Sequence, residues 1–333
     1  MTIARVARIH GFGGTDMIRI EDIDVPAPRA GEARLRMKTH GVVRADILRR
    51  YGMYPGQPQP PLIFGFEGVG EIESLGDGVS GFAIGDTVGV LPVPSAQYGL
   101  CGELAIIDAS QLVGHPAGVS LEKGAAIWSS YLTAYNGLVF DGGLRPGETV
   151  LITAGSSAVG IAAIQIARKI GAIPIAVTRG TDKVERIRGY GAEHVIATDT
   201  CGDLASAIKT ATGGKGARLA FDAVGGSQLL SLLDAMQTHG TIVNYGILDP
   251  NPLELSLVPL LTKAVTLRGS NVTYVLLDPA KRQEAIDFVM EGVEQGVLDP
   301  PVEAVFALDQ IGAAHQLVES NTTAGKVVIH MDL

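Results

Sequence analysis

The sequence predicts an α/β fold in which a doubly wound parallel sheet is inserted into a β-rich domain. From about residue 149 to residue 244, short apolar stretches alternate with helical ones, which is typical of a parallel sheet covered by helices. The first 120 residues instead carry short strand-like stretches separated by Gly and Pro, which indicate a partly closed antiparallel barrel or sandwich. Glycine makes up 43 of the 333 residues, roughly twice its usual ~7%. We therefore expect many tight turns, or backbone that approaches a ligand closely.

Composition excludes several classes of function. The net charge of −9 disfavours a nucleic-acid or anionic-membrane surface, because few cations would be available to neutralise phosphates. No apolar run approaches the ~18 residues of a membrane span, and residues 1–10 lack the apolar core of a signal peptide. Cys101 and Cys201 are the two cysteines; they cannot form a disulfide framework, and a reducing compartment is the simplest interpretation. We expect a soluble, cytoplasmic protein.

The elements expected in the first part of the chain are strands at 34–38, 65–75 and 85–91. The run PGQPQPP at 55–61 cannot lie inside a sheet, because proline has no backbone N–H to donate. It therefore predicts a loop, which we place at the edge of a cleft. An Ala-rich helix is expected at 121–138.

The alternating middle segment and the returning tail complete the predicted fold. Strands are expected at 149–153, 173–177, 194–196, 219–222, 240–244, 264–267 and 326–331. Helices are expected at 158–170, 181–189, 203–210, 227–236, 279–296 and 310–319. The middle strands lack polar alternation, as expected when helices cover both faces of a sheet. These elements predict a dinucleotide-binding domain at 123–268, inserted between segments 1–122 and 269–333 of the β-rich domain.

The strongest local motif is TVLITAGSSAVG at residues 149–160. Gly155, Ser157 and Gly160 occupy the three positions of GxGxxG, with Ser at the second. A strand precedes the motif and a helix follows it, so the first backbone N–H groups of the helix can bind an anion. The predicted contacts to a dinucleotide pyrophosphate are Gly155, Ser156, Ser157, Ala158, Val159 and Gly160. The alternative is a closely packed strand–helix turn without a ligand.

The end of the second strand indicates which cofactor is used. An NAD site typically has an acidic residue there, which binds the ribose 2′-OH. Here Thr178 and Arg179 follow the strand, with Lys183 shortly after, and such a group suits a 2′-phosphate. We expect NADPH, although an exposed Arg after a strand is often merely solvated.

Several motifs in this chain match one known superfamily. They are GVVRAD at 41–46, GMYP at 52–55, GFEGVG at 65–70, GDTV at 85–88, YLTAY at 131–135 and AGKVV at 324–328. With the order of β-rich segment, dinucleotide motif and returning tail, the whole chain resembles the medium-chain dehydrogenase/reductase superfamily. The resemblance implies a Rossmann sheet inserted into a GroES-like catalytic domain.

The resemblance also bears on zinc. Val43 and Phe66 stand where the zinc alcohol dehydrogenases have Cys and His ligands, and neither side chain can bind a metal. Only Cys101 lies in 92–112, where a structural zinc lobe would carry four cysteines. The chain is therefore similar to the zinc-independent quinone oxidoreductase and enoyl reductase branch. Members of that branch reduce a quinone or an α,β-unsaturated carbonyl with hydride from NADPH.

Two candidate catalytic residues follow from the resemblance. Tyr54 stands where enoyl reductases have a proton-donating Tyr, and a phenol can act as a general acid; it could instead only line the cleft. Asp46 matches the Asp of the superfamily, but it could equally brace a helix. Val43 stands where this branch commonly has Asn, so the chain departs from the pattern there. His40 is expected to be structural.

The resemblance supplies further contacts by position. The remaining cofactor contacts are predicted at Thr133, Val224, Asn244, Tyr245 and Gly246, with Asn321 and Lys326 as a clamp on the phosphates. Lys326 could also be a solvated surface residue. The substrate pocket is predicted to be lined by Tyr51, Tyr54, Phe64, Trp128, Tyr131 and Leu248, a set that suits a small hydrophobic or aromatic electron acceptor.

Other readings stay open at this point. A non-catalytic NADPH-binding protein, such as a sensor or a crystallin relative, is favoured by Val43 in place of a polar residue. An NADP-dependent alcohol dehydrogenase that recruits a metal is a third reading. A homodimer is implied by the family, through a sheet edge strand near 265–267.

Overall fold

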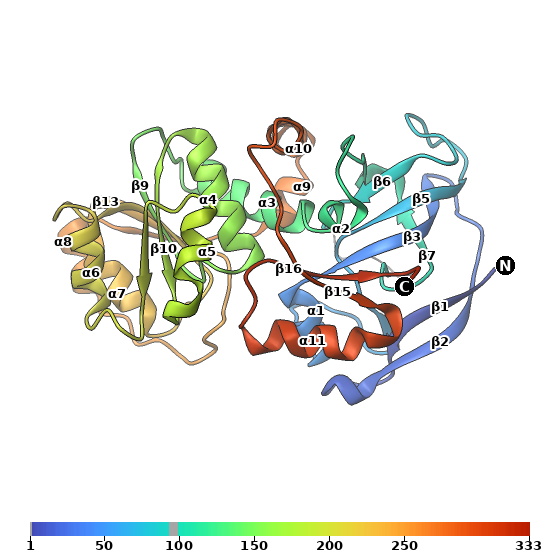
Figure 1. The fold of residues 1–333 in the computed structure, drawn as a ribbon, viewed down its shortest axis with the longest axis horizontal. Helices are drawn as coiled ribbons and strands as arrows, with labels where there is room; N and C mark the ends of the chain where they lie inside the picture. Colours follow the sequence, from blue (N-terminus) through green and yellow to red (C-terminus); the bar gives the residue numbers. More distant parts are fainter. Residues whose placement is uncertain (1, 93–98) are drawn as a thin grey trace. The chain divides into compact units, whose positions relative to one another are not determined.

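The computed structural model describes residues 2–92 and 99–333, and the chain forms two compact units (Figure 1). The first unit comprises Met1–Ser129 and Pro300–Leu333, and the second comprises Ser130–Asp299. Residues 269–299 therefore pack with the second unit. The boundaries expected after residues 122 and 268 stay a prediction of domain organisation. Residues 93–98, part of the stretch considered for a zinc lobe, lie outside the described residues.

The second unit is built on a six-stranded parallel sheet with the order β11-β10-β9-β12-β13-β14. Its strands are β9 (Thr149–Ile152), β10 (Ile173–Thr178), β11 (His194–Ala197), β12 (Ala217–Asp222), β13 (Met236–Asn244) and β14 (Thr266–Gly269). The chain order runs outward from β9 in one direction and then from β12 in the other. The switch point, where ligands bind in doubly wound sheets, therefore lies between β9 and β12.

Helices cover both faces of this sheet, as Figure 1 shows for α4 and α5 on one face and α6 and α7 on the other. Their bounds are α4 (Ala158–Ile170), α5 (Val184–Gly189), α6 (Leu204–Ala211), α7 (Gln228–Ala235), α8 (Leu257–Lys263), α9 (Val272–Leu276) and α10 (Pro279–Glu294). Leu151 and Ile175 of the sheet are fully buried against Ile208 and Leu232 of the helices. The predicted doubly wound sheet is confirmed.

The first unit is mainly antiparallel. One sheet has the order β15-β16-β3-β5-β6-β8 with β7 added on β3, and a second has the order β2-β1-β4. The strands are β1 (Thr2–Ile9), β2 (Ile18–Val25), β3 (Glu32–Val42), β4 (Leu62–Ile63), β5 (Gly68–Leu75), β6 (Thr87–Val90), β7 (Leu104–Asp108), β8 (Leu112–Gly114), β15 (Val302–Ala307) and β16 (Lys326–His330). The pair β15–β16 is parallel. This β-rich unit matches the expected architecture.

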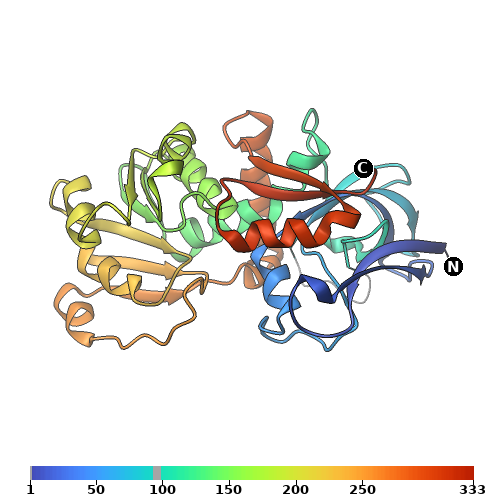
Figure 2. The same ribbon diagram turned by 60° about the horizontal axis from the view of Figure 1, so that its bottom comes forward.

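Two helices frame the candidate site of the first unit. They are α1 (Arg44–Arg50), directly after β3, and α11 (Ile311–Ser320), which runs beside β16 (Figure 2). Ile311 and Ala314 of α11 pack in one buried cluster with Val327 and Ile329 of β16. The Pro-rich stretch 55–61 lies in the loop between α1 and β4, as predicted.

The single helix expected at 121–138 is wrong. The chain forms α2 (Leu121–Gly124), α3 (Trp128–Tyr135) and a π-helical turn over Asn136–Asp141. Gly137 allows the last segment to lie against β12, since a methyl group there would be 2.1 Å from the Phe221 ring. Within the described residues, no helix combines the length and the apolar character needed to cross a membrane.

Candidate functional site

The turn between β9 and α4 has the shape expected of a pyrophosphate site. Gly155 N–H donates to the Val177 carbonyl at 2.9 Å, and a methyl group on Gly155 would lie 2.8 Å from the Ala176 Cβ. Ser157 caps the helix, because its Oγ accepts from Gly160 N at 3.0 Å. The first turn of α4 thus stands at the carboxyl edge of the sheet, where its N–H groups and dipole favour an anion. These residues fit the pyrophosphate of a dinucleotide.

A buried carboxylate joins the carboxyl ends of the central strands. Asp222 is fully buried and its Oδ1 accepts the Thr153 hydroxyl at 2.7 Å. It also accepts from Val224 N at 3.1 Å, Gly225 N at 2.9 Å and Asn244 Nδ2 at 3.0 Å. With all these donors in place, the loops after β12 and β13 are fixed beside the end of β9.

Tyr245 connects the same loops to the α4 turn. Its ring stacks on Phe221, with centroids 4.1 Å apart, and the Ser157 side chain acts on its hydroxyl. Burial, assisted by the Asp222 charge, raises the pKa of Tyr245, so the phenol stays protonated. The backbone comes close at Gly246, where a methyl group would lie 2.7 Å from the Ala223 carbonyl oxygen. The predicted cofactor residues Ser157, Val224, Asn244, Tyr245 and Gly246 therefore share one edge of the sheet.

The loop after β10 carries both charge signs. Thr178 is buried and Arg179 is exposed, while Lys183 Nζ donates to Ser156 Oγ at 3.4 Å. Two acidic residues, Asp182 and Asp199, also lie here. A methyl group on Gly180 would be 2.6 Å from Asp182 Oδ1 and 3.8 Å from Asp199 Oδ2. Basic side chains that would favour NADPH and acidic side chains that would favour NADH thus lie in or beside the same loop.

The aromatic residues predicted to line a substrate pocket differ in environment. Phe64, Trp128 and Tyr131 are each about 1% exposed and fill interiors. The Phe64 ring meets His315 edge-on at 5.0 Å, and the Tyr131 hydroxyl donates to Gln165 at 2.6 Å. A role for these three in a pocket stays a prediction.

The other predicted contacts of this kind are less buried. Tyr51 and Leu248 are 45% and 41% exposed, and Thr133, in α3, is half-buried. The Tyr51 ring lies under the guanidinium of Arg50 at 4.6 Å. For these residues too, the contact with substrate or cofactor stays a prediction.

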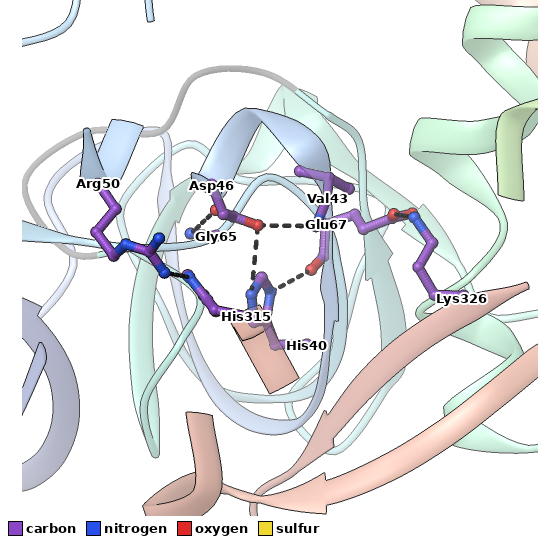
Figure 3. A network of polar contacts seen from close by, with 8 residues as sticks. All are labelled: His40, Val43, Asp46, Arg50, Gly65, Glu67, His315 and Lys326. Atoms are coloured by element: carbon purple, nitrogen blue, oxygen red, sulfur yellow. Dashed lines mark hydrogen bonds and ion pairs between the residues drawn. The ribbon is translucent and has the colours of Figure 1, made fainter. Parts of the chain in front are cut away.

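A buried polar network organises the first unit (Figure 3). Asp46 is 0% exposed and accepts from Val43 N and Gly65 N, both at 3.0 Å. His40 Nε2 lies 3.7 Å from the same carboxylate, and His40 Nδ1 is 3.0 Å from the Glu67 carbonyl oxygen. Asp46 therefore fastens the start of α1 to the loop before β5, which supports the bracing reading over the catalytic one.

Glu67 and Lys326 form a buried ion pair in this network. Lys326 Nζ lies 2.5 Å from Glu67 Oε1, with side chains 4% and 0% exposed, and Ser129 N donates to Glu67 Oε2 at 2.9 Å. The charge of Lys326 is thus neutralised inside the protein. That pairing argues against both the predicted phosphate clamp and a solvated surface position.

Asn321 ends α11 in a left-handed conformation, with φ of 58°. Its side chain receives a hydrogen bond from the Arg44 guanidinium, and its Nδ2 donates to the Glu319 carbonyl at 3.1 Å. The side chain thus serves the helix end, and its predicted contact to phosphates stays a prediction.

Arg50 and His315 complete the network drawn in Figure 3. Arg50 is 0% exposed and pairs with Glu319 at 2.7 Å and with the Gly13 carbonyl at 3.0 Å. Burial, together with the Arg50 and His40 charges, lowers the pKa of His315 to about 3. His315 therefore stays neutral and can face the Arg50 guanidinium, 3.4 Å away.

Tyr54, Phe66 and Arg49 form a second cluster beside this network. The Tyr54 and Phe66 rings have centroids 5.3 Å apart, and the Arg49 guanidinium lies 5.2 Å from the centre of the Phe66 ring. Burial raises the pKa of Tyr54, while the Arg49 charge opposes that shift and the Asp46 charge adds to it. Arg49 was not among the predicted site residues; its only signal in the sequence was the basic pair Arg49-Arg50 at the end of α1.

Phe66 stands where a metal ligand was considered, and it is 4% exposed. The described residues contain no cluster of three or more His, Cys, Asp or Glu side chains arranged to hold a metal ion. Val43, at the start of α1, adds only aliphatic carbons. The atoms gathered here can supply a phenol, a cation and an aromatic face.

Comparison with known proteins places the chain among dehydrogenases. The alcohol dehydrogenase GroES-like domain matches residues 29–140, and the zinc-binding dehydrogenase family matches residues 158–291. A quinone oxidoreductase-like protein 2 homolog of Nematostella vectensis is 31% identical, over 90% of this chain and 82% of that protein. A 2-haloacrylate reductase of a Burkholderia species is 28% identical, over 97% and 98%. The crystal structure of an NAD-dependent alcohol dehydrogenase is 29% identical with a TM-score of 0.89, over 98% and 99%.

Proposed function

Because the chain belongs to the medium-chain dehydrogenase/reductase superfamily, in its quinone oxidoreductase and enoyl reductase-like branch, we propose that it is a zinc-independent, NADPH-dependent reductase of quinones or α,β-unsaturated carbonyls. The observation that carries this proposal is the cluster around Phe66. At the two positions considered for zinc ligands, Val43 and Phe66 have no donor atom, and a half-buried phenol packs on the Phe66 ring.

The cofactor site proposed is the carboxyl edge of the six-stranded sheet. The α4 turn would hold the pyrophosphate, and the loops after β12 and β13, fixed by Asp222, would border the remainder of the cofactor. Members of this superfamily bind nicotinamide cofactors, which supply a hydride to the acceptor when bound. Thr178, Arg179 and Lys183 support NADPH, whereas Asp182 and Asp199 would favour NADH.

Tyr54 is the proposed proton donor. Its pKa is raised by burial, so the phenol is protonated at neutral pH and can deliver a proton to the carbon or oxygen next to the site of hydride addition. Asp46 takes no part in the transfer in this proposal. It holds the start of α1, and thereby positions the helix that leads to Tyr54.

An acceptor panel tests the function. Purified protein is incubated with NADPH or NADH and with neutral quinones, enones and unsaturated esters, and cofactor oxidation is followed by absorbance. We expect NADPH oxidation with at least one acceptor and much slower oxidation of NADH. If no acceptor of the panel is reduced and NADPH still binds tightly, the protein is instead a non-catalytic NADPH-binding protein. The apolar side chain of Val43 favours that alternative.

A recruited metal is tested separately. Metal analysis of the purified protein, and activity after dialysis against a chelator, should show no stoichiometric metal and no loss of rate. Stoichiometric zinc with chelator-sensitive alcohol oxidation would replace the proposal with an alcohol dehydrogenase.

We also propose a homodimer formed through the edge strand β14. All four of its residues are exposed, and the neighbouring α8 exposes Leu257, Val258 and Leu261 by 62%, 63% and 79%. An exposed edge strand beside apolar side chains is suited to pairing with a symmetric copy. Light scattering should give about twice the chain mass for the native protein, and a monomer mass for the native protein would refute this pairing.

A further inference from the structure

Arg49 is a buried cation with an unsatisfied donor. The residue is 4% exposed, and its Nη1 is buried without a hydrogen-bond partner. Its neighbour Arg50 is fully buried too, yet Arg50 pairs with Glu319, Gly13 and His315. A buried guanidinium without an anion is strongly destabilising. Among the described residues, 2–92 and 99–333, Arg50 thus has its partners and Arg49 Nη1 has none, which favours a ligand as the partner of Arg49.

The surroundings of Arg49 restrict what that partner can be. The guanidinium lies over the Phe66 ring, a position that supplies cation–π attraction but no hydrogen bond. Asp46, one turn earlier on α1, already accepts from Val43 N and Gly65 N. The Nη1 group of Arg49 therefore keeps its N–H donors for an anion, and a carboxylate matches the geometry of a guanidinium best.

Gln57 is an alternative partner for Arg49 within the chain. Gln57 Oε1 is also buried without a partner, and Gln57 Nε2 donates to the Arg49 carbonyl at 3.3 Å. A neutral amide oxygen could satisfy one N–H but would leave the charge uncompensated. Gln57 therefore belongs in the test as a separate variant.

The acid proposed for the reaction lies on the same ring. Tyr54 packs on Phe66 at 5.3 Å, and the charge of Arg49 acts on the Tyr54 phenol. The segment after Arg49 is exposed at Tyr51 and Met53, so the cluster lies near the surface of its unit. The Arg49 guanidinium and the Tyr54 ring thus both lie beside the Phe66 ring.

We propose that Arg49 binds the carboxylate of the acceptor, so that the substrate class is an α,β-unsaturated carboxylate. This inference rests on the proposed function and narrows its acceptor. Free carboxylates accept hydride poorly, because addition at the β-carbon creates a second negative charge on the enediolate. A buried guanidinium on the carboxylate would stabilise that charge as it develops.

The step balances without a further reagent. A nicotinamide cofactor held at the carboxyl edge of the six-stranded sheet would supply the hydride that adds to the β-carbon. The C=C electron pair would then move to the α-carbon and its carboxylate. Tyr54 then gives its phenol proton to the α-carbon, which yields the saturated carboxylate and NADP+, and the phenolate recovers a proton from water.

The test compares an acid with its ester. Wild type, Arg49→Met, Arg49→Lys and Gln57→Leu are assayed with NADPH on crotonate and on methyl crotonate, and Arg36→Met serves as a matched control at an exposed arginine of β3. The ratio of kcat/KM for acid over ester should fall about 10- to 100-fold in Arg49→Met, the effect of losing a charge-assisted contact. The ratio should recover in part in Arg49→Lys and stay at the wild-type value in the other two variants.

Binding supplies a second readout that needs no turnover. Calorimetry of the protein with NADP+ and butyrate, the saturated product, should give a Kd that Arg49→Met raises by about the same factor. The inference is overturned if Arg49→Met leaves the acid-to-ester ratio or the Kd of butyrate unchanged. Reduction of quinones could still support the proposed function in that case. Conversely, butyrate binding that depends on Arg49 without turnover on any acceptor would uphold the carboxylate site and refute the reductase. Should Arg49→Met fail to fold, Arg49→Lys with the ester comparison decides.

Discussion

The two units present their candidate functional atoms in different ways. In the unit of residues 130–299, the groups proposed to face the cofactor are mainly backbone groups: the α4 turn, the loop at Gly225 and the close approach at Gly246. In the other unit, the candidate chemistry depends on side chains brought together from distant segments, such as Glu67 with Lys326, 259 residues apart. Backbone sites follow from local sequence patterns, whereas side-chain sites depend on tertiary packing. Substitutions should therefore change the free energy of unfolding more in the side-chain site of residues 1–129 and 300–333 than at the cofactor edge.

The largest expected effect is on the Glu67–Lys326 pair. Glu67→Gln leaves a buried ammonium without its counter-charge, which should lower the free energy of unfolding by about 3–5 kcal/mol. Lys169→Met is the matched control, since it breaks the Lys169–Glu291 pair, whose Glu side chain is 58% exposed, and should cost less than about 1 kcal/mol. Urea unfolding followed by circular dichroism measures both. Equal losses would contradict the contrast between the units.

The same contrast explains what could be predicted from the sequence. The α4 helix was expected at 158–170 and lies there, and β9 to β13 were expected within four residues of their bounds. Those elements carry their signal locally, as continuous apolar strands between helices. The strands β1, β2, β4, β7, β8 and β15 were missed. Charged residues interrupt the apolar pattern of β1, β2 and β15, as in TIARVARI of β1. The strands β4 and β8 are only two and three residues long, and β7 pairs with β3, a strand distant in sequence.

The candidate site followed the same rule. The residues of the α4 turn and the loops after β12 and β13 were expected and are gathered at one sheet edge. Lys326 was expected at a phosphate, and its real partner, Glu67, comes from β-strand packing that no spacing in the sequence reveals. Arg49 was missed because an unpartnered guanidinium is defined by what surrounds it.

The next effect concerns Tyr54. Tyr54→Phe should lower kcat about 100-fold, a usual contribution of a general acid, without changing the affinity for NADPH. Because the acid must be protonated, activity should persist to alkaline pH and fall only as pH rises through the phenol pKa. Burial raises that pKa above its ordinary value of 10.0. Steady-state rates from pH 6 to 11 and calorimetric NADPH binding test this, and an unchanged kcat would reduce Tyr54 to a packing partner of Phe66.

A smaller effect is expected at the loop after β10. Arg179→Asp should reduce the preference for NADPH over NADH by about 1–3 kcal/mol, the range for a lost charge-assisted contact. Asp182→Asn is the matched control at the opposing charge, and it should weaken NADH more than NADPH. The ratio of kcat/KM for the two cofactors measures both variants. If Arg179→Asp leaves that ratio unchanged, the loop after β10 does not bind the 2′-phosphate.

The smallest effect tests whether the α4 turn depends on its backbone more than on its side chains. Ser157 stands at the middle position of the glycine motif, where its Oγ accepts a hydrogen bond from Gly160 N. Ser157→Ala should lower the free energy of unfolding by about 1 kcal/mol through loss of the cap, and Ser157→Gly by only a few tenths. NADPH affinity, measured by calorimetry, should change less than threefold in the glycine variant, since the backbone N–H groups remain in place. A larger loss with glycine would mean that the Ser157 hydroxyl itself contacts the cofactor, and the turn would then resemble the side-chain site of the other unit.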